Sequence, residues 1–224
     1  MKTLKTILAI ALSLAMISAL CACSIKVGGE ETWEYSADTK EGCEQLFNDF
    51  FRKTFENTNQ VVTVKGNGSL VSTETIDGTS DCITYSTTGA DTYSFIKDGE
   101  YIYALKDNDS QQYYMVGEEN YSYGYFVYRN SIDILADVPE DGVTFACEVK
   151  GSSEDGNSTN SLTLELSTDE GSVKITAASE NDLVKTVTIV TNDGGETRTT
   201  EMTFEYGTAS VTLPDISDWE KTEA

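Results

Sequence analysis

The alternation of apolar and polar residues through the last third of the chain restricts the fold most strongly. Apolar side chains recur at every second position in 143–149, 162–166 and 202–206, and 183–190 is rich in branched apolar residues. Asp-Gly and Glu-Gly pairs between these segments are typical of tight turns. A period of two places the apolar side chains of a strand on one face. The pattern predicts an antiparallel meander with one apolar face and one face of Thr, Ser, Glu and Lys.

A β-hairpin is predicted over residues 92–106. Two strand-like segments, TYSFIK and EYIYALK, flank Asp98-Gly99, which favours a type I′ turn. Pairing across this turn places four apolar side chains on each face of the hairpin. One face holds Tyr93, Phe95, Ile102 and Ala104, and the other holds Ile96, Tyr101, Tyr103 and Leu105. Since both faces are apolar, we expect both to be covered.

An amphipathic helix is predicted over about residues 40–55. Apolar residues recur there at steps of three and four, namely Cys43, Leu46, Phe47, Phe50, Phe51 and Phe55. Asp38 and Glu41 resemble a capping box, and Asn57 follows the last apolar position. A stripe with four phenylalanines requires a large apolar partner surface. A second short helix is predicted over 125–136, ahead of Pro139.

The first 22 residues have the features of a cleavable export signal. Lys2 and Lys5 precede an apolar run over 7–20. A bilayer core of about 30 Å requires about twenty apolar residues, so this run favours a signal peptide over a membrane-spanning helix.

The sequence Leu20-Cys21-Ala22-Cys23 resembles the lipobox of bacterial lipoproteins. In that motif a small residue precedes the modified cysteine, and a leucine lies three positions before it. The resemblance implies cleavage before Cys23 and acylation of Cys23. The alternative is an ordinary secreted protein, cut near Ala19 or Ala22, in which Cys23 is an unmodified thiol.

Composition excludes several classes of function. The chain holds 38 acidic and 15 basic residues, a net charge of −23 that repels nucleic-acid phosphates. It has no histidine, the commonest general base and metal ligand, and no CxxC pair, phosphate loop or dinucleotide-binding motif. We therefore expect no enzymatic activity, no cofactor, no metal and no nucleic-acid partner. The mature cysteines, Cys23, Cys43, Cys82 and Cys147, do not suggest a disulfide framework, although one pair could form outside the cell.

Two segments carry a resemblance to a known family. SFIKDGEYIYAL (94–105) is similar to a strand, Asp-Gly turn and Tyr-rich strand of the LolA/LolB-like lipoprotein-carrier superfamily and its lipoprotein relatives in Gram-positive bacteria. LVKTVTIV (183–190), followed by EMTFEYGTASVTLPD (201–215), resembles its closing strands. The resemblance implies an unclosed β-barrel whose concave apolar face holds acyl chains, with helices acting as a lid.

Together these patterns predict a mainly β (α+β) protein. We expect one long, curved antiparallel sheet, an unclosed half-barrel, with the N-terminal helix on its concave face and a second short helix. The expected organisation is a signal peptide (1–22), a lipidated tether (23–37), the half-barrel domain (38–216) and a C-terminal tail (217–224).

The predicted function is binding of an acyl chain, a lipid or a lipoprotein by a lipoprotein anchored at the extracytoplasmic face of the cell membrane. The candidate cavity-lining residues are Phe47, Phe50, Phe51, Tyr93, Phe95, Tyr101, Ile102, Tyr103 and Phe204. Two alternatives stay open. One is an envelope interaction or sensing module with a fully packed core. The other is a carbohydrate-binding lipoprotein that uses exposed tyrosines, eight of which lie between Tyr101 and Tyr128.

Overall fold

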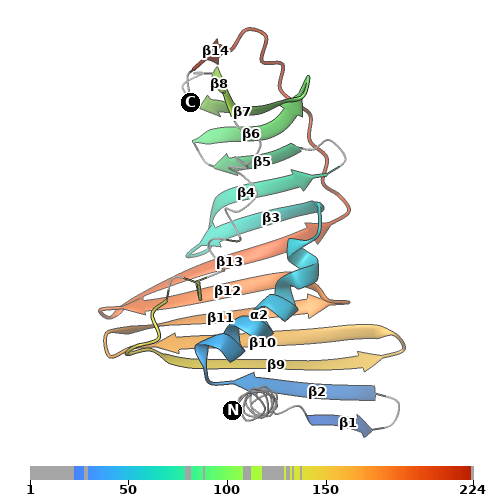
Figure 1. Ribbon diagram of the computed structural model, residues 1–224, viewed down its shortest axis with the longest axis vertical. Coiled ribbons are helices and arrows are strands. Elements are labelled where there is room, and N and C mark those ends of the chain that lie inside the picture. Colours follow the sequence, from blue (N-terminus) through green and yellow to red (C-terminus); the bar gives the residue numbers. More distant parts are fainter. Residues whose placement is uncertain are drawn as a thin grey trace, which may run out of the picture. The chain divides into compact units, whose positions relative to one another are not determined.

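The computed structural model shows a mainly β protein built on one sheet (Figure 1). It describes residues 23–27, 30–78, 82–87, 89–107, 112–117, 129, 132, 134–136 and 138–222. The sheet has 14 strands in the order β1-β2-β9-β10-β11-β12-β13-β3-β4-β5-β6-β7-β8-β14. The predicted fold class, one long sheet with an N-terminal helix, is confirmed. The sheet is mixed, because β14 pairs with β8 in parallel, whereas the sequence predicted a wholly antiparallel sheet.

The chain divides into two compact units, and each is described by itself. Unit 1 consists of residues 1–54, 137–184 and 190–197, and unit 2 consists of 55–136, 185–189 and 198–224. Unit 1 contains β1 (Cys23–Val27), β2 (Glu30–Ala37), β9 (Thr144–Glu154), β10 (Asn157–Ser167), β11 (Gly171–Glu180) and nearly all of α2 (Lys40–Phe55). Unit 2 contains β3 (Asn59–Gly66), β4 (Ser69–Asp77), β5 (Cys82–Thr87), β6 (Ala90–Lys97), β7 (Glu100–Asp107), β8 (Gln112–Gly117) and β14 (Glu220–Lys221). Residues of β12 (Leu183–Asp193) and β13 (Glu196–Tyr206) belong to both units.

The strands of unit 1 have the predicted apolar and polar faces. Leu162, Leu164 and Leu166 of β10 are at most 5% exposed, and Leu164 pairs with Cys147 and with Ile175 on its two neighbouring strands. The opposite face is charged, and it includes ion pairs from Lys150 to Glu148 and Glu34 and from Lys174 to Glu165. This alternation gives α2 one apolar surface on which to pack.

The segment expected to be a tether, 23–37, contains two strands instead. β2 pairs with β1 on one side and with β9 on the other, where Tyr35 lies opposite Val149. Trp33, Tyr35 and Ala37 are half-buried, while the residues between them are exposed. β2 is therefore part of the sheet that supports α2.

The helix α2 crosses the face of β10 and β11 in Figure 1. It begins at Lys40, and the Gly42 N–H donates to Thr39 Oγ1 at 3.2 Å. Thr39 is thus the N-cap, and the predicted capping box of Asp38 and Glu41 is wrong. The helix starts one residue later than that box requires, which places Gly42 where the box needs a Glu. The Phe51 ring packs at 4.6 Å from that of Phe47 and at 5.4 Å from that of Phe50, measured between ring centroids.

The predicted hairpin in unit 2 is confirmed. β6 and β7 pair antiparallel, and Asp98 and Gly99 have φ angles of 55° and 83°, as a type I′ turn requires. Phe95 lies opposite Ile102, as predicted. Their face of the hairpin joins a core cluster with Cys82, Ala104 and Ile216, against which Val211 and Trp219 also pack.

The expected C-terminal tail, 217–224, joins the structure of unit 2 through Trp219 and the short strand β14. The expected signal peptide, 1–22, and most of the expected second helix, 125–136, lie outside the described residues. Within that second segment, Arg129 and Ile132 are helical, and Ile132 is fully buried. No helix in the described part of the chain is long and apolar enough to cross a membrane.

Candidate ligand-binding groove

An open groove of about 530 Å³ lies in unit 1 between α2 and the sheet. It is lined by residues from the helix, from β2, β9, β10 and β11, and from the turn after β11. They are Tyr35, Gln45, Leu46, Asp49, Phe50, Arg52, Lys53, Val149, Asn160, Ser179 and Asp182. This volume is within the range of about 300–1,000 Å³ that is usual for small-molecule sites.

One part of the groove is apolar. Leu46 and Phe50, four residues apart on α2, present an edge to the groove and are 8% and 9% exposed. Val149 of β9 lies in the same lining and is 9% exposed, and it pairs with the half-buried Tyr35 of β2. The next positions around the helix, Phe47 and Phe51, are at most 1% exposed. The apolar face of α2 is therefore wider than the part of it that packs on the sheet. The remaining edge of this face, at Leu46 and Phe50, forms one wall of the groove.

The rest of the groove is polar. Residues that are register partners on β9, β10 and β11 form rows across the sheet, and an apolar row is followed by a polar one. One row consists of Val149, Leu162 and Ala177, which are register partners on β9, β10 and β11. The row two residues further along the strands consists of Gly151, Asn160 and Ser179. The Asn160 side-chain amide donates to Ser179 Oγ at 3.3 Å and to Asp182 Oδ1 at 3.5 Å. Ser179 is only 3% exposed.

Gly151 is required by the close packing in this polar row. A Cβ atom at this position would collide with the Trp33 indole and with Asn160 Oδ1. Trp33 is the register partner of Gly151 on β2, so the indole can lie over the glycine and beside Asn160. The absence of a side chain at Gly151 thus lets Trp33 border the polar row.

Charged side chains from the helix complete the polar part. Lys53 Nζ lies 2.6 Å from Asp182 Oδ2, and both side chains are about half exposed. Asp49 and Arg52 lie in the same lining. These four side chains carry two positive and two negative charges, so this part of the groove is close to neutral in a strongly acidic protein.

Polar contacts at both ends of α2 hold the helix on unit 1. Near its start, Lys40 Nζ donates to the Val138 carbonyl at 2.7 Å, and the Cys43 thiol donates to the Ala37 carbonyl at 3.6 Å. At its other end, the Val184 N–H donates to Thr54 Oγ1 at 3.0 Å, and Thr54 is fully buried. These contacts indicate that α2 is a fixed wall of the groove.

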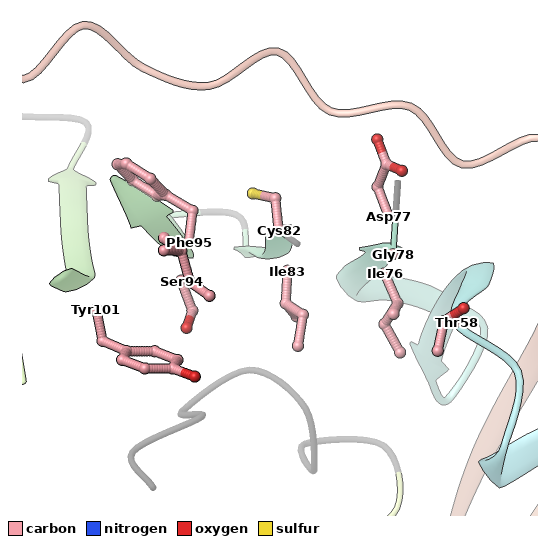
Figure 2. A pocket seen from close by; sticks show the side chains of 10 residues that line it. Thr58, Ile76, Asp77, Gly78, Cys82, Ile83, Ser94, Phe95 and Tyr101 are labelled. Carbon is pink, nitrogen blue, oxygen red and sulfur yellow. The ribbon is translucent and has the colours of Figure 1, made fainter. Parts of the chain in front are cut away.

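A second pocket of about 230 Å³ lies in unit 2, near the ends of β4 to β7 (Figure 2). Figure 2 shows Asp77, Cys82 and Phe95 on one side of the sheet and Ile83 and Tyr101 on the other. The Val211 N–H donates to Asp77 Oδ2 at 3.2 Å. Burial, together with the charge of Asp77, raises the pKa of the Cys82 thiol to about 12, so this thiol is not a nucleophile in the folded protein.

The predicted cavity residues are distributed over both units. Phe47, Phe50 and Phe51 belong to unit 1, and only Phe50 of these lines the groove. The others belong to unit 2, where Phe95 and Tyr101 line the second pocket. Tyr93 packs on the core cluster with Phe95 and Ile102, while Tyr103 and Phe204 are 8% and 4% exposed.

The sequence prediction missed most of the groove. Asn160, Ser179 and Asp182 belong to separate strands or turns, and only the strand register brings them together. A usable signal was the alternation of Trp33, Tyr35 and Ala37 in β2. Among the tyrosine side chains that the structure describes, none is fully exposed, and 121–128 lies outside the described residues. The described residues contain no group of three or more acidic or cysteine side chains that could hold a metal ion.

Comparisons with known proteins add no assignment. No protein-family model matches the chain, and a search of curated proteins finds no significant match.

Proposed function

We propose that this protein is an extracytoplasmic lipoprotein, anchored to the cell membrane through acylated Cys23, that binds an amphipathic ligand in the groove of unit 1. The ligand has an acyl chain or a similar apolar part, and it is bound without chemical change. The observation that carries the proposal is the two-part lining of the groove. Leu46, Phe50 and Val149 offer apolar surface, and Arg52 and Lys53 offer hydrogen-bond donors beside it.

The apolar part would supply part of the binding energy. Covering apolar surface contributes about 25 cal/mol per Å² removed from water, so an apolar chain gains by displacing water from the Leu46, Phe50 and Val149 surfaces. The polar part would supply orientation. Arg52 and Lys53 can donate to oxygen atoms of a head group, which water would otherwise have to solvate.

The anchoring step rests on the lipobox-like sequence that ends at Cys23. Two or more acyl chains hold a protein on a membrane stably, whereas one chain does so only marginally. We expect metabolic labelling with an alkynyl fatty acid to mark the wild-type protein and to leave Cys23→Ser unmarked. A mature wild-type protein of unmodified mass would exclude the anchor.

The ligand can be tested by native mass spectrometry of the protein extracted from membranes and by displacement of a fluorescent fatty acid. Gln45→Trp adds an indole at an exposed position that lines the groove. Asn48→Trp is the matched control, because Asn48 is equally exposed on the same helix but is not part of the lining. We expect Gln45→Trp to weaken fatty-acid binding about tenfold or more, a change of about 1.4 kcal/mol, because the added indole occupies space in the groove, and Asn48→Trp to bind like the wild type.

Two results would contradict the proposal. Equal binding by both tryptophan variants would place the ligand elsewhere. A wild-type protein that is repeatedly free of lipid and does not bind the fatty acid would exclude ligand binding and favour the interaction or sensing module.

A further inference from the structure

Two of the three described free cysteines lie against each other in unit 1. Cys43 is in the first turns of α2 and Cys147 is in the middle of β9, and their side chains are hydrogen-bonded to each other. They are 0% and 3% exposed. The hydrogen bond lowers the pKa of Cys43 and raises that of Cys147.

The position of each thiol is fixed by regular structure. Ala37, at the end of β2, is the register partner of Cys147 on β9. Two residues later α2 begins, and the Cys43 N–H donates to the Thr39 carbonyl at 2.9 Å in its first turn. The Cys43 thiol thereby lies 3.6 Å from the Ala37 carbonyl oxygen and beside Cys147. A bond between the two sulfur atoms would join two elements that are already in place.

The third cysteine provides an internal contrast. Cys82 is 1% exposed. The pKa of its thiol is raised by burial and by the Asp77 carboxylate, not by another thiol. It therefore behaves as an ordinary buried cysteine, which packs as a small apolar side chain. Burial alone does not explain why two cysteines from α2 and β9 meet in unit 1.

We propose that Cys43 and Cys147 form a structural disulfide that covalently fastens α2, the wall of the groove, to β9. The oxidant is a disulfide, either a small molecule or an oxidised dithiol protein of the extracytoplasmic compartment. The Cys43 thiolate attacks one sulfur of the oxidant, which releases one thiol and leaves a mixed disulfide on Cys43. The Cys147 thiolate then attacks the Cys43 sulfur, the new bond forms, and the second thiol of the oxidant leaves.

The step is balanced. Two protein thiols lose two protons and two electrons, and one oxidant disulfide becomes two thiols. Because both thiols are buried in the folded protein, the exchange takes place before α2 is fully packed on the sheet. The inference rests on the proposed extracytoplasmic location, which supplies the oxidant, but it is independent of the proposed ligand because it concerns only how the wall is held.

The test is thiol mapping of the refolded full chain. Cys21→Ser and Cys23→Ser leave three thiols, and the reduced, unfolded chain is refolded with a mixture of reduced and oxidised glutathione. After quenching with N-ethylmaleimide and digestion, mass spectrometry identifies the linked peptides. We expect the Cys43–Cys147 peptide to exceed every linked peptide of Cys82 about tenfold or more, because Cys82 belongs to unit 2 and to a strand that does not neighbour β9 in the sheet. Cysteines that are far apart cannot be bridged without backbone movement.

Single replacements complete the test. Cys82→Ala should leave the Cys43–Cys147 link unchanged, whereas Cys43→Ala should abolish it and leave Cys147 alkylated. Recovery of Cys43 and Cys147 as alkylated thiols in the refolded wild type, or links that involve Cys82 as often as Cys147, would overturn the proposal. The wild-type mapping decides the matter even if Cys43→Ala does not fold.

Discussion

The hydroxyl of Thr54 is the contact that we expect to hold the last turn of α2 on the sheet. It accepts a hydrogen bond from the Val184 N–H at 3.0 Å and is fully buried. Thr54→Val keeps the shape of the side chain and removes this acceptor. A buried donor that loses its partner costs about 1–3 kcal/mol, and the added buried methyl group returns about 0.8 kcal/mol. We therefore expect Thr54→Val to lower the free energy of unfolding by about 0.2–2.2 kcal/mol.

Urea unfolding measures this change, and amide hydrogen exchange identifies its cause. The two tryptophans, Trp33 and Trp219, lie in units 1 and 2, so a Trp219→Phe background reports on unit 1 alone. In Thr54→Val the Val184 amide should exchange faster than in the wild type. Thr54→Ser, which keeps the acceptor, should retain slow exchange at Val184.

Thr144→Val is the control for the substitution itself, because Thr144 is exposed on β9 in the same unit. We expect its free energy of unfolding to change by less than about 0.5 kcal/mol. If Thr54→Val shows the same small change and wild-type exchange at Val184, the hydroxyl does not fasten the helix. The last turn of α2 would then not be fixed to the sheet by this hydrogen bond.

Two further predictions concern the packing of each unit. The Phe47→Leu and Phe51→Leu double-mutant cycle should give a coupling of about 0.5–1.5 kcal/mol by urea unfolding, because the two rings are in contact, and additivity within about 0.3 kcal/mol would refute the stacking. For Cys82, the pKa is raised from 9.0 to about 12, so the folded state holds the proton more tightly and stability should fall as pH rises through that range. Cys82→Ala should remove this part of the pH dependence, and an identical pH profile in both proteins would contradict the assignment.

Local patterns were sufficient for the meander and the hairpin. The period of two and the Asp98-Gly99 turn act within a few residues, so the sequence could be interpreted without knowing which strands meet. The strand β2 was missed because its alternation spans only Trp33, Tyr35 and Ala37 among polar neighbours. Its stability comes from pairing with β9, a partner more than one hundred residues away in sequence. The parallel pairing of β14 likewise depends on tertiary packing, because Ile216 and Trp219, which precede β14, pack in the core cluster of unit 2.

For a related reason, the sequence alone could not tell which aromatic residues of α2 border the groove. The apolar stripe selected Phe47, Phe50 and Phe51, and of these only Phe50 lines the groove, whereas Phe47 and Phe51 are at most 1% exposed. The apolar residues of α2 that stay uncovered are those that lie over polar residues of the sheet. That depends on register, which the sequence of a single strand does not contain.

The change in the sheet between two neighbouring rows also explains why a groove exists at all. A helix packs closely on a sheet where large apolar side chains of the helix and of the sheet contact each other. In unit 1, Leu162 marks the last apolar row on β10, and Asn160, two residues away, begins a row whose members are small or polar. Asn160 and Ser179 satisfy each other by a hydrogen bond and do not fill the space under the helix. Because this row is polar, it leaves a margin of Leu46 and Phe50 uncovered. A ligand that covers this margin must present an apolar part to the helix and a polar part to Arg52 and Lys53.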